Sequence, residues 1–392
     1  MIILLAKLIS YLSKLFNLGS GATWPGEIAL KLDPEILRKI APKNVILVAG
    51  TNGKTTTALM IKTILENGGH KVIHNASGAN LLNGVVSAII TSPPGDWGVF
   101  EVDENSLPLV MKFIKDIKII VLLNLFRDQL DRYGEVDVIA DKWKVALQTL
   151  KTSDFKLVLN ADDPLVASLG KKNTLYFGLN DRKRFQKFSE HAMDSQFCPR
   201  CGEALAYDGT YYSHIGIWHC PSCGLRRPTP NVTTAVYPLA GIYNRYNTLA
   251  AVTVAKVLDL PVDLNKFQPA FGRQEEINGV KVILSKNPAS FNESLRTAIG
   301  AKAKKILLVL NDRIPDGRDV SWIWDVDFEM LGKQHVLASG DRQLDLALRL
   351  KYAGIPTDVV NLSEGVKQAD YILATYSAML EVRKILTGKR IL

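Results

Sequence analysis

Short apolar runs alternate with amphipathic stretches along most of the chain. The runs are rich in Val, Ile and Leu, and several are followed by segments in which apolar residues recur at helical spacing. This pattern predicts an α/β fold whose parallel sheet is covered by helices on both faces. In the first part of the chain the predicted strands are residues 45–49, 71–74, 98–102, 117–123 and 156–160.

A second series of alternating elements predicts a smaller C-terminal α/β domain that begins near residue 278. We therefore expect an N-terminal helical segment (residues 1–40), a central domain (41–277) and a C-terminal domain (278–392). The predicted elements of the last domain are strands at 280–284, 305–310, 334–339 and 357–360, with helices at 293–300, at 342–352 and from 377.

Residues 1–16 are apolar with interspersed lysines, but the run is shorter than the roughly 20 residues that span a bilayer. An amphipathic helix is expected here, either packed on the protein or lying on a membrane surface. No export signal is recognisable, so we expect a cytoplasmic protein that can be peripheral to the inner face of the plasma membrane.

The strongest chemical signal is the segment Gly-Thr-Asn-Gly-Lys-Thr-Thr at the end of the first predicted strand. A strand, a Gly-rich turn and a helix in this order bind phosphate, because backbone N–H groups and the helix dipole face the anion. Val48 stands where the usual P-loop pattern has a glycine, which indicates a shortened variant. The expected nucleotide-binding residues of this loop are Gly50, Thr51, Asn52, Gly53, Lys54, Thr55 and Thr56, with Lys54 on the outer phosphates and Thr55 on Mg²⁺.

Further polar residues stand at strand ends or helix starts. Glu101 ends a predicted strand, where its carboxylate suits a magnesium ion beside the phosphate loop or is simply solvated. Residues 124–134 form a polar loop after another strand, and such a loop is either functional or merely hydrated. Asn244 and Asn247 share a face near the start of a long predicted helix, where they either donate to a base or sugar or cap the helix.

All four cysteines lie between residues 180 and 233, where the alternation is interrupted. They form two Cys-x-x-Cys pairs, separated by residues 202–219, and a glycine follows the second cysteine of each pair. This spacing predicts a structural zinc site in a zinc-ribbon insertion at about 190–230. Four thiolates would close the site, so that this chain keeps no cysteine as a nucleophile. The expected zinc ligands are Cys198, Cys201, Cys220 and Cys223.

The net charge of +9 and the pI of about 9.2 suggest an acidic partner, which could be a nucleotide, anionic lipid or nucleic acid. A zinc-ribbon nucleic-acid-binding ATPase is therefore one alternative. The basic residues are dispersed along the chain, however, and the ribbon has few aromatic residues for base stacking. No nucleic-acid partner is expected.

The order of these motifs resembles the Mur ligase family over the central domain. The resemblance is carried by the phosphate loop, Glu101, the Asp-Arg-Tyr of 131–133, Lys142 and the Asn-Arg-Tyr-Asn of 244–247. The cysteine insertion, the polar loop from residue 124 and the segment 316–325 are similar to a branch that amidates lipid II. The resemblance implies that ATP phosphorylates the α-carboxylate of D-isoglutamate in the stem peptide. Ammonia then attacks the acyl phosphate to give D-isoglutamine.

The resemblance also implies the cofactors and partners. ATP, Mg²⁺ and structural Zn²⁺ are expected, with lipid II as the substrate at the inner membrane surface and a GatD-type glutaminase subunit as the source of ammonia. By position, Glu101 corresponds to a magnesium ligand and Lys142 to the carbamylated lysine of the family. Asn244, Asn247 and Arg273 correspond to nucleotide contacts. Where many Mur ligases have a metal-binding histidine, this chain has Gln129, a neutral and weaker ligand for a second Mg²⁺.

The C-terminal domain resembles the amidating branch more than the amino-acid ligases. The branch is expected to use a C-terminal aspartate to support the partner's active site, and the candidates are Asp316 and Asp319, with Asp312 in reserve. The main alternative is a stand-alone Mur-type or folylpolyglutamate-type amino-acid ligase. Such a ligase would need an Asp and a His near its substrate, where this chain has Ser-Lys-Asn-Pro at 285–288.

Overall fold

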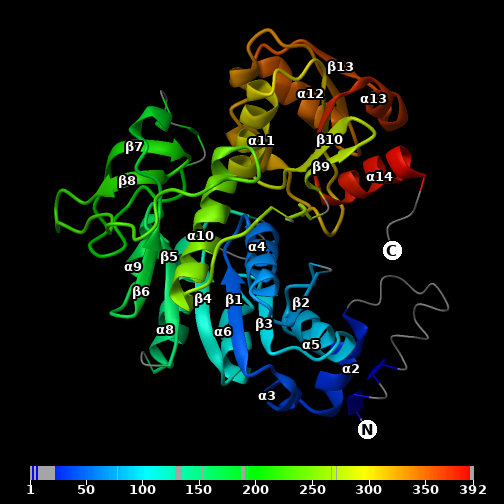
Figure 1. Ribbon diagram of the computed structural model, residues 1–392. Coiled ribbons are helices and arrows are strands. Elements are labelled where there is room, and N and C mark those ends of the chain that lie inside the picture. The colour runs from blue at the N-terminus through cyan, green and yellow to red at the C-terminus, as the bar shows by residue number, and fades with distance from the viewer. Residues whose placement is uncertain are drawn as a thin grey trace.

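A computed structural model describes residues 2–3, 6–7, 23–76, 78–128, 135–151, 154–186, 190–191, 193–265, 267–270 and 272–388. Two α/β units lie one above the other, each built on a six-stranded sheet (Figure 1). The helix expected at residues 1–16 lies largely outside the described residues. None of the helices in the described ranges combines the length and the apolar character needed to traverse a bilayer.

The first sheet is fully parallel and has the strand order β2-β3-β1-β4-β5-β6. All five predicted strands are confirmed within one residue at each end. The edge strand β6 escaped prediction because three of its four residues are only half-buried, so it lacks an apolar run. The strands are β1 (Asn44–Ala49), β2 (Val72–His74), β3 (Trp97–Glu101), β4 (Ile117–Leu122), β5 (Lys156–Asn160) and β6 (Thr174–Phe177).

Helices cover both faces of this sheet. One face carries α4 (Lys54–Asn67) and α10 (Ile242–Leu258), and the other carries α5 (Leu82–Thr91), α6 (Leu107–Phe113), α8 (Val136–Gln148) and α9 (Pro164–Ser168). Residues 45, 47 and 49 of β1 pack into the core under α5, α6 and α8, whereas 46 and 48 pack under α4 and α10. Because both faces are buried, the strand reads as a continuous apolar run. The short helices α2 (Trp24–Leu32) and α3 (Ile36–Ile40) pack against α5.

The cysteine-containing insertion is a small β-hairpin attached to the end of β5. Its strands β7 (Ala206–Tyr212) and β8 (Ile215–His219) are antiparallel and follow a 3₁₀ turn, η1 (Arg182–Arg184). Asp162, fully buried just beyond β5, accepts hydrogen bonds from Arg227 Nε at 2.6 Å and from the Tyr246 hydroxyl at 2.6 Å. These bonds fix the insertion to the sheet and to α10.

The second sheet is mixed, with the order β13-β12-β11-β14-β10-β9 and only β9 antiparallel. β9 begins at Arg273, so this sheet starts before the expected boundary at 278. The central strand β14 was not predicted, although its four residues are all buried. The strands are β9 (Arg273–Ile277), β10 (Val280–Leu284), β11 (Ile306–Val309), β12 (Val336–Ser339), β13 (Thr357–Val359) and β14 (Tyr371–Ala374).

The helices of the second unit pack on both faces of its sheet. α11 begins at Pro288, earlier than the predicted residue 293, because Asn287 and Ser290 form a capping box. The helical elements are α11 (Pro288–Gly300), η2 (Ser321–Asp325), η3 (Phe328–Leu331), α12 (Gln343–Tyr352), α13 (Leu362–Gln368) and α14 (Tyr376–Thr387).

We expect Asp162→Ala to lower the free energy of unfolding by about 3–5 kcal/mol, because it leaves the Arg227 guanidinium without its buried partner. Urea unfolding followed by circular dichroism measures the change. Asp181→Ala is the matched control, since its ion pair with Arg184 is exposed and should be worth about 1 kcal/mol or less. Equal losses in the two variants would contradict the anchoring role of Asp162.

Candidate active site

The predicted phosphate loop joins β1 to α4, and both of its glycines have backbone conformations that favour glycine. Gly50 has φ +138° and Gly53 has φ +90°, conformations that other residues rarely adopt. A Cβ atom on Gly53 would lie 2.1 Å from Oδ1 of Asn247. The loop therefore packs directly against α10, which carries the asparagines expected to bind nucleotide.

Lys54 is buried at the base of this loop. Its Nζ donates to the carbonyl oxygens of Gly50 at 2.5 Å and Thr51 at 3.2 Å, and it forms an ion pair with Glu104 at 3.0 Å. Burial opposes the negative charge on Glu104, but Lys54 outweighs burial and lowers the pKa of Glu104. The ionised Glu104 carboxylate thus holds the Lys54 ammonium group against the loop.

Thr55 and Glu101 provide the oxygen ligands expected for magnesium. Oγ1 of Thr55 lies 2.6 Å from Oε2 of Glu101, which is only 2% exposed. Asn75 fixes the end of β3 by exchanging two hydrogen bonds with the backbone of Glu101, at 2.9 and 3.0 Å. A hydroxyl and a carboxylate side by side are hard oxygen donors, so these residues fit Mg²⁺.

A cavity of about 370 Å³ opens above the loop and is shared by the two units. Lys286 enters it from the end of β10 and forms an ion pair with Asp128, which follows β4. Burial opposes the charge on Lys286, but Asp128 and Glu104 outweigh it and raise the pKa of the lysine. We call this space the phosphate cavity; its wall includes Lys54, Thr55, Glu101, Glu104, Asp128, Arg273 and Lys286.

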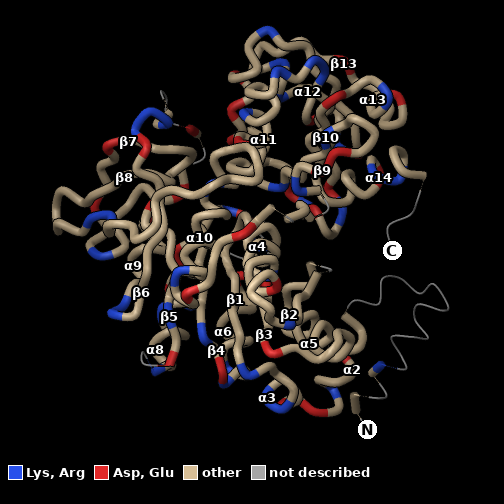
Figure 2. The backbone as a smooth tube through the Cα atoms, in the orientation of Figure 1, with Lys and Arg blue, Asp and Glu red and all other residues tan. Residues whose placement is uncertain are grey.

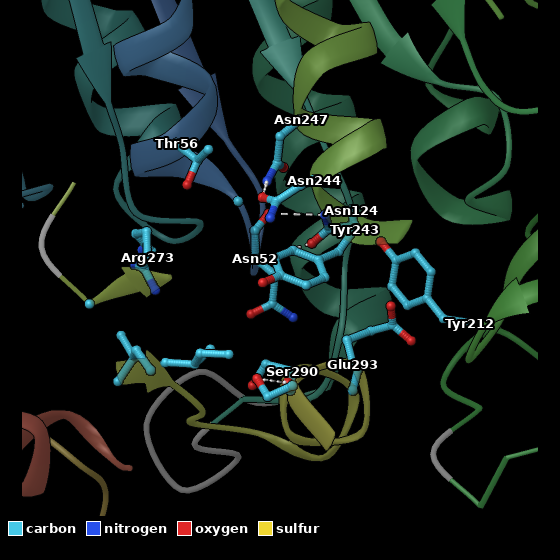
Figure 3. Close-up of a pocket in the computed structure, with 16 residues that line it drawn as sticks. Asn52, Thr56, Asn124, Tyr212, Tyr243, Asn244, Asn247, Arg273, Ser290 and Glu293 are labelled. Atoms are coloured by element: carbon cyan, nitrogen blue, oxygen red, sulfur yellow. Dashed lines mark hydrogen bonds between the residues drawn. The ribbon is translucent and has the colours of Figure 1, made fainter. Parts of the chain in front are cut away.

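A second pocket adjoins the loop between α10 and α11 (Figure 3). Asn247 Nδ2 donates to Asn244 Oδ1 at 3.0 Å, and both side chains line the pocket together with Tyr243 and Arg273. The N-cap residue of α10 is Gly241, which has no side-chain cap bond, and Asn244 Nδ2 also donates to the Ala240 carbonyl at 2.7 Å. Apolar residues 283, 284 and 289 complete a wall suited to a flat base.

The sequence analysis missed Glu293, which reaches into this pocket from α11 (Figure 3). Burial raises the pKa of its carboxyl to about 7, despite the neighbouring Arg296. Asp128 and Lys286 were also not singled out individually. Their position just beyond two strand ends is a signal that could have found them, because such loops carry ligands in parallel sheets.

The four candidate catalytic residues are not gathered at one point. Asp316 is buried, and it accepts hydrogen bonds from the backbone N–H and the hydroxyl of Ser377 at 2.7 and 2.5 Å. Asp319 is exposed, whereas Asp312 forms an ion pair with Arg342 at 3.0 Å. Asp316 and Asp319 line a third space, of about 150 Å³, which shares Asp128 and Lys286 with the phosphate cavity.

Lys142 lies apart from these aspartates on the exposed side of α8. Its Nζ donates to Oδ1 of Asn105 at 2.8 Å, and it lines a groove between α6 and α8. Asn105 directly follows Glu104, which lines the phosphate cavity. Lys142 therefore contacts a residue next to the wall of that cavity but does not line the cavity itself. Gln129 and the Asp-Arg-Tyr of 131–133 lie outside the described residues.

The four cysteines converge as predicted. All four sulfur atoms lie within 4.8 Å of one another, with 3.6 Å between Cys198 and Cys223 and 3.5 Å between Cys201 and Cys220. Zn–S bonds of about 2.3 Å in a tetrahedron place the sulfur atoms about 3.8 Å apart, so the cluster fits zinc. The backbone N–H of Cys223 lowers the pKa of the Cys220 thiol to about 7, whereas burial and hydrogen bonds with the other three sulfur atoms raise the pKa of Cys201 to about 12, so the fit to zinc rests on the geometry of the four sulfur atoms.

Comparison with known proteins decides the family. The family description "Mur ligase middle domain" matches residues 48–255, and "MurT ligase C-terminal" matches residues 284–379. The MurT subunit of lipid II isoglutaminyl synthase from Staphylococcus aureus (strain COL) is 36% identical over 377 residues, which cover 87% of this chain and 85% of the relative. The chain belongs to the MurT family of Mur ligases. Its members are ATP-dependent ligases, and membership implies ATP and Mg²⁺.

Other relatives agree with the MurT assignment. The MurT subunit from Streptococcus pneumoniae (strain ATCC BAA-255 / R6) is 32% identical, with 96% of this chain and 95% of the relative covered. Among solved structures, a pseudomurein peptide ligase type C from Methanothermus fervidus superimposes with a TM-score of 0.69 at 24% identity, covering 90% of this chain and 80% of that one. MurF from Acinetobacter baumannii gives 0.63 at 17% identity, covering 92% and 80%. These two structures show the Mur ligase fold.

Thr55→Ala should weaken Mg²⁺-dependent ATP binding at least about tenfold, because it removes a hard ligand next to Glu101. Isothermal titration with ATP at several Mg²⁺ concentrations measures the effect. Thr63→Ala, on the same helix but bonded only to the Leu59 carbonyl in its own turn, is the matched control. If Thr55→Ala binds ATP with unchanged magnesium dependence, the assigned metal site is wrong.

The purified chain should contain one zinc ion, and Cys220→Ser should lose it and destabilise the insertion. Elemental analysis gives the metal content, and limited proteolysis reports the folding of residues 193–230. Ser222→Ala changes the same knuckle without removing a sulfur ligand and should retain the metal. Metal-free wild-type protein with an intact hairpin would refute a structural zinc site.

Proposed function

We propose that this chain is the synthase subunit that amidates the α-carboxylate of D-isoglutamate in the stem peptide of lipid II. The proposal rests on MurT relatives that are named as subunits of lipid II isoglutaminyl synthase. One observation about the chain itself supports it most directly: the phosphate loop and Lys286, from different units, face one cavity. Such a cavity suits the transfer of a phosphoryl group between a nucleotide and a second substrate.

The reaction has two steps. A carboxylate oxygen of the substrate attacks the γ-phosphorus of ATP, the bond to the β-phosphate oxygen breaks, and ADP leaves. Ammonia then attacks the acyl carbon, and phosphate leaves as the nitrogen loses a proton. Thr55 and Glu101 would hold Mg²⁺, whose charge offsets that of the phosphates. Lys54 and Lys286, one from each unit, line the cavity and stabilise the charge that develops on the phosphoryl oxygens.

Lys142 remains a candidate for supporting this chemistry. By its position in the motifs shared with Mur ligases, Lys142 corresponds to the carbamylated lysine of that family. A carbamate would add a carboxylate-like group next to Asn105 and Glu104. Its exposed position on α8 allows reaction with carbon dioxide. We propose this role for Lys142 alongside those of Lys54 and Lys286.

Ammonia comes from a separate glutaminase subunit of the GatD type. The four cysteines of this chain converge on a metal site, which leaves no thiol to hydrolyse glutamine. The C-terminal unit offers an apolar face for a partner: Leu344, Leu348 and Tyr352 recur every four residues on α12 and are exposed. Trp324 is half exposed beside Tyr352, at a ring distance of 5.6 Å.

Asp319 is the aspartate best placed to support the partner's active site. It is exposed near the Trp324 face, whereas both oxygens of Asp316 are engaged by Ser377 at the start of α14. The backbone N–H of Ser321 lowers the pKa of Asp319, which keeps the carboxylate ionised. An ionised carboxylate can orient a histidine of a partner.

The test combines this chain with a class I glutaminase, ATP, Mg²⁺ and lipid II, and follows the stem peptide by mass spectrometry. We expect amidation with glutamine, and also with ammonium chloride in the absence of the glutaminase. Asp319→Asn should lower the glutamine-dependent rate at least about tenfold and leave the ammonium-dependent rate unchanged. Asp341→Asn, at an exposed carboxylate already paired with Arg313, is the matched control. ATP consumption without an amide from either nitrogen source would exclude the proposed function.

A further inference from the structure

Asp128 carries a buried acceptor that no described residue satisfies. One carboxylate oxygen binds Lys286, whereas the other, Oδ1, has no hydrogen-bond partner among the described residues. The residue is 8% exposed and lies where two cavities meet. A buried oxygen without a partner costs about 1–3 kcal/mol, so its retention needs an explanation.

The second of these cavities lies between Asp128 and residues of the C-terminal unit. We call it the entry cavity; the charged residues that line it are Arg127, Asp128, Lys286, Asp316, Asp319 and Asp325. Asp319 is exposed, and Asp325 is half-buried with an oxygen 3.3 Å from Arg127. The entry cavity therefore lies beside the phosphate cavity, between it and the exposed Asp319, and the two cavities share Asp128 and Lys286 as lining residues.

The chemistry of this wall distinguishes between nucleophiles. Carboxylates at the mouth attract a small cation and repel anions. Ammonia is mostly ammonium at neutral pH, and ammonium has no lone pair with which to attack an acyl carbon. A buried carboxylate oxygen can bind ammonium through one N–H and accept its proton. Burial raises the pKa of Asp128, although Lys286 and Lys54 lower it and Glu104 raises it further, so this carboxylate is a better proton acceptor than an aspartate in water.

We propose that Asp128 binds the ammonium ion that enters from the Asp319 side and takes its proton, releasing ammonia at the phosphate cavity. This inference rests on the proposed function. The transfer is balanced: the Asp128 carboxylate becomes a carboxylic acid as ammonium becomes ammonia. Ammonia then forms the new C–N bond while the C–O bond to phosphate breaks, and the proton that the nitrogen loses leaves with the phosphate. Asp128 returns its own proton to water.

The geometry also accounts for the Lys286 pair. Lys286 holds Oδ2 of Asp128, which leaves Oδ1 as the oxygen without a partner among the described residues, and Lys286 also lines the phosphate cavity. An Asn side chain at position 128 would keep the size of the group but could not accept the proton. Asp128→Asn therefore separates proton uptake from packing.

The experiment compares two nitrogen nucleophiles in the absence of the glutaminase. Wild-type chain and Asp128→Asn receive ATP, Mg²⁺ and lipid II with either ammonium chloride or hydroxylamine, which is largely neutral at the assay pH and traps acyl phosphates as hydroxamates. We expect Asp128→Asn to lower kcat/KM for ammonium at least about tenfold, with hydroxamate formation and the Kd of Mg-ATP changed less than about twofold. Asp341→Asn, whose carboxylate pairs with Arg313 outside both cavities, should match the wild type.

Each other outcome has a distinct meaning. Equal losses with ammonium and hydroxylamine, or a changed Kd of Mg-ATP, would show that Asp128 serves phosphate or metal binding, and the inference would be overturned. Unchanged ammonium kinetics in Asp128→Asn would also overturn it, while the proposed function would stand. If the wild type forms neither amide nor hydroxamate, the proposed function itself fails and the inference fails with it.

Discussion

The parallel pairing of β1 with β3 and β4 is the constraint on which the active site depends. The register places Val48 opposite Glu101 and Ala49 opposite Leu122, so all three strands end at one edge of the sheet. The phosphate loop, the Glu101 carboxylate and the segment that leads to Asp128 are therefore side by side, although they are far apart in sequence. A slip of one residue in β3 would turn the Glu101 side chain to the opposite face of the sheet.

The two units meet through polar groups. Across their boundary, Lys286 binds Asp128, Asn52 and Asn287 lie within hydrogen-bonding distance at 3.2 Å, and the Gln274 side chain donates to the Tyr243 hydroxyl at 2.7 Å. Charged groups are scattered over both units instead of gathering on one broad basic face (Figure 2).

The sequence allowed most of the central sheet and the phosphate loop to be predicted because their signals are local. Continuous apolar runs mark buried parallel strands, and the glycines of the loop are dictated by positive φ at positions 50 and 53. The roles of Asp128, Lys286 and Glu293 depend on how the second unit packs against the first, and no local pattern encodes that contact. The same limit applies to Asp316, whose burial against Ser377 became visible only in three dimensions.

The separate cores of the two units have a mechanical consequence. The chain passes between the sheets through the connection from Asp259 to Gly272, and the apolar cores lie almost wholly on either side of that connection. Opening a polar boundary exchanges hydrogen bonds within the protein for hydrogen bonds to water, whereas opening a shared core would expose apolar surface to water. Separating the two units would therefore expose little apolar surface, and a ligand that contacts both units would act as a removable cross-link between them.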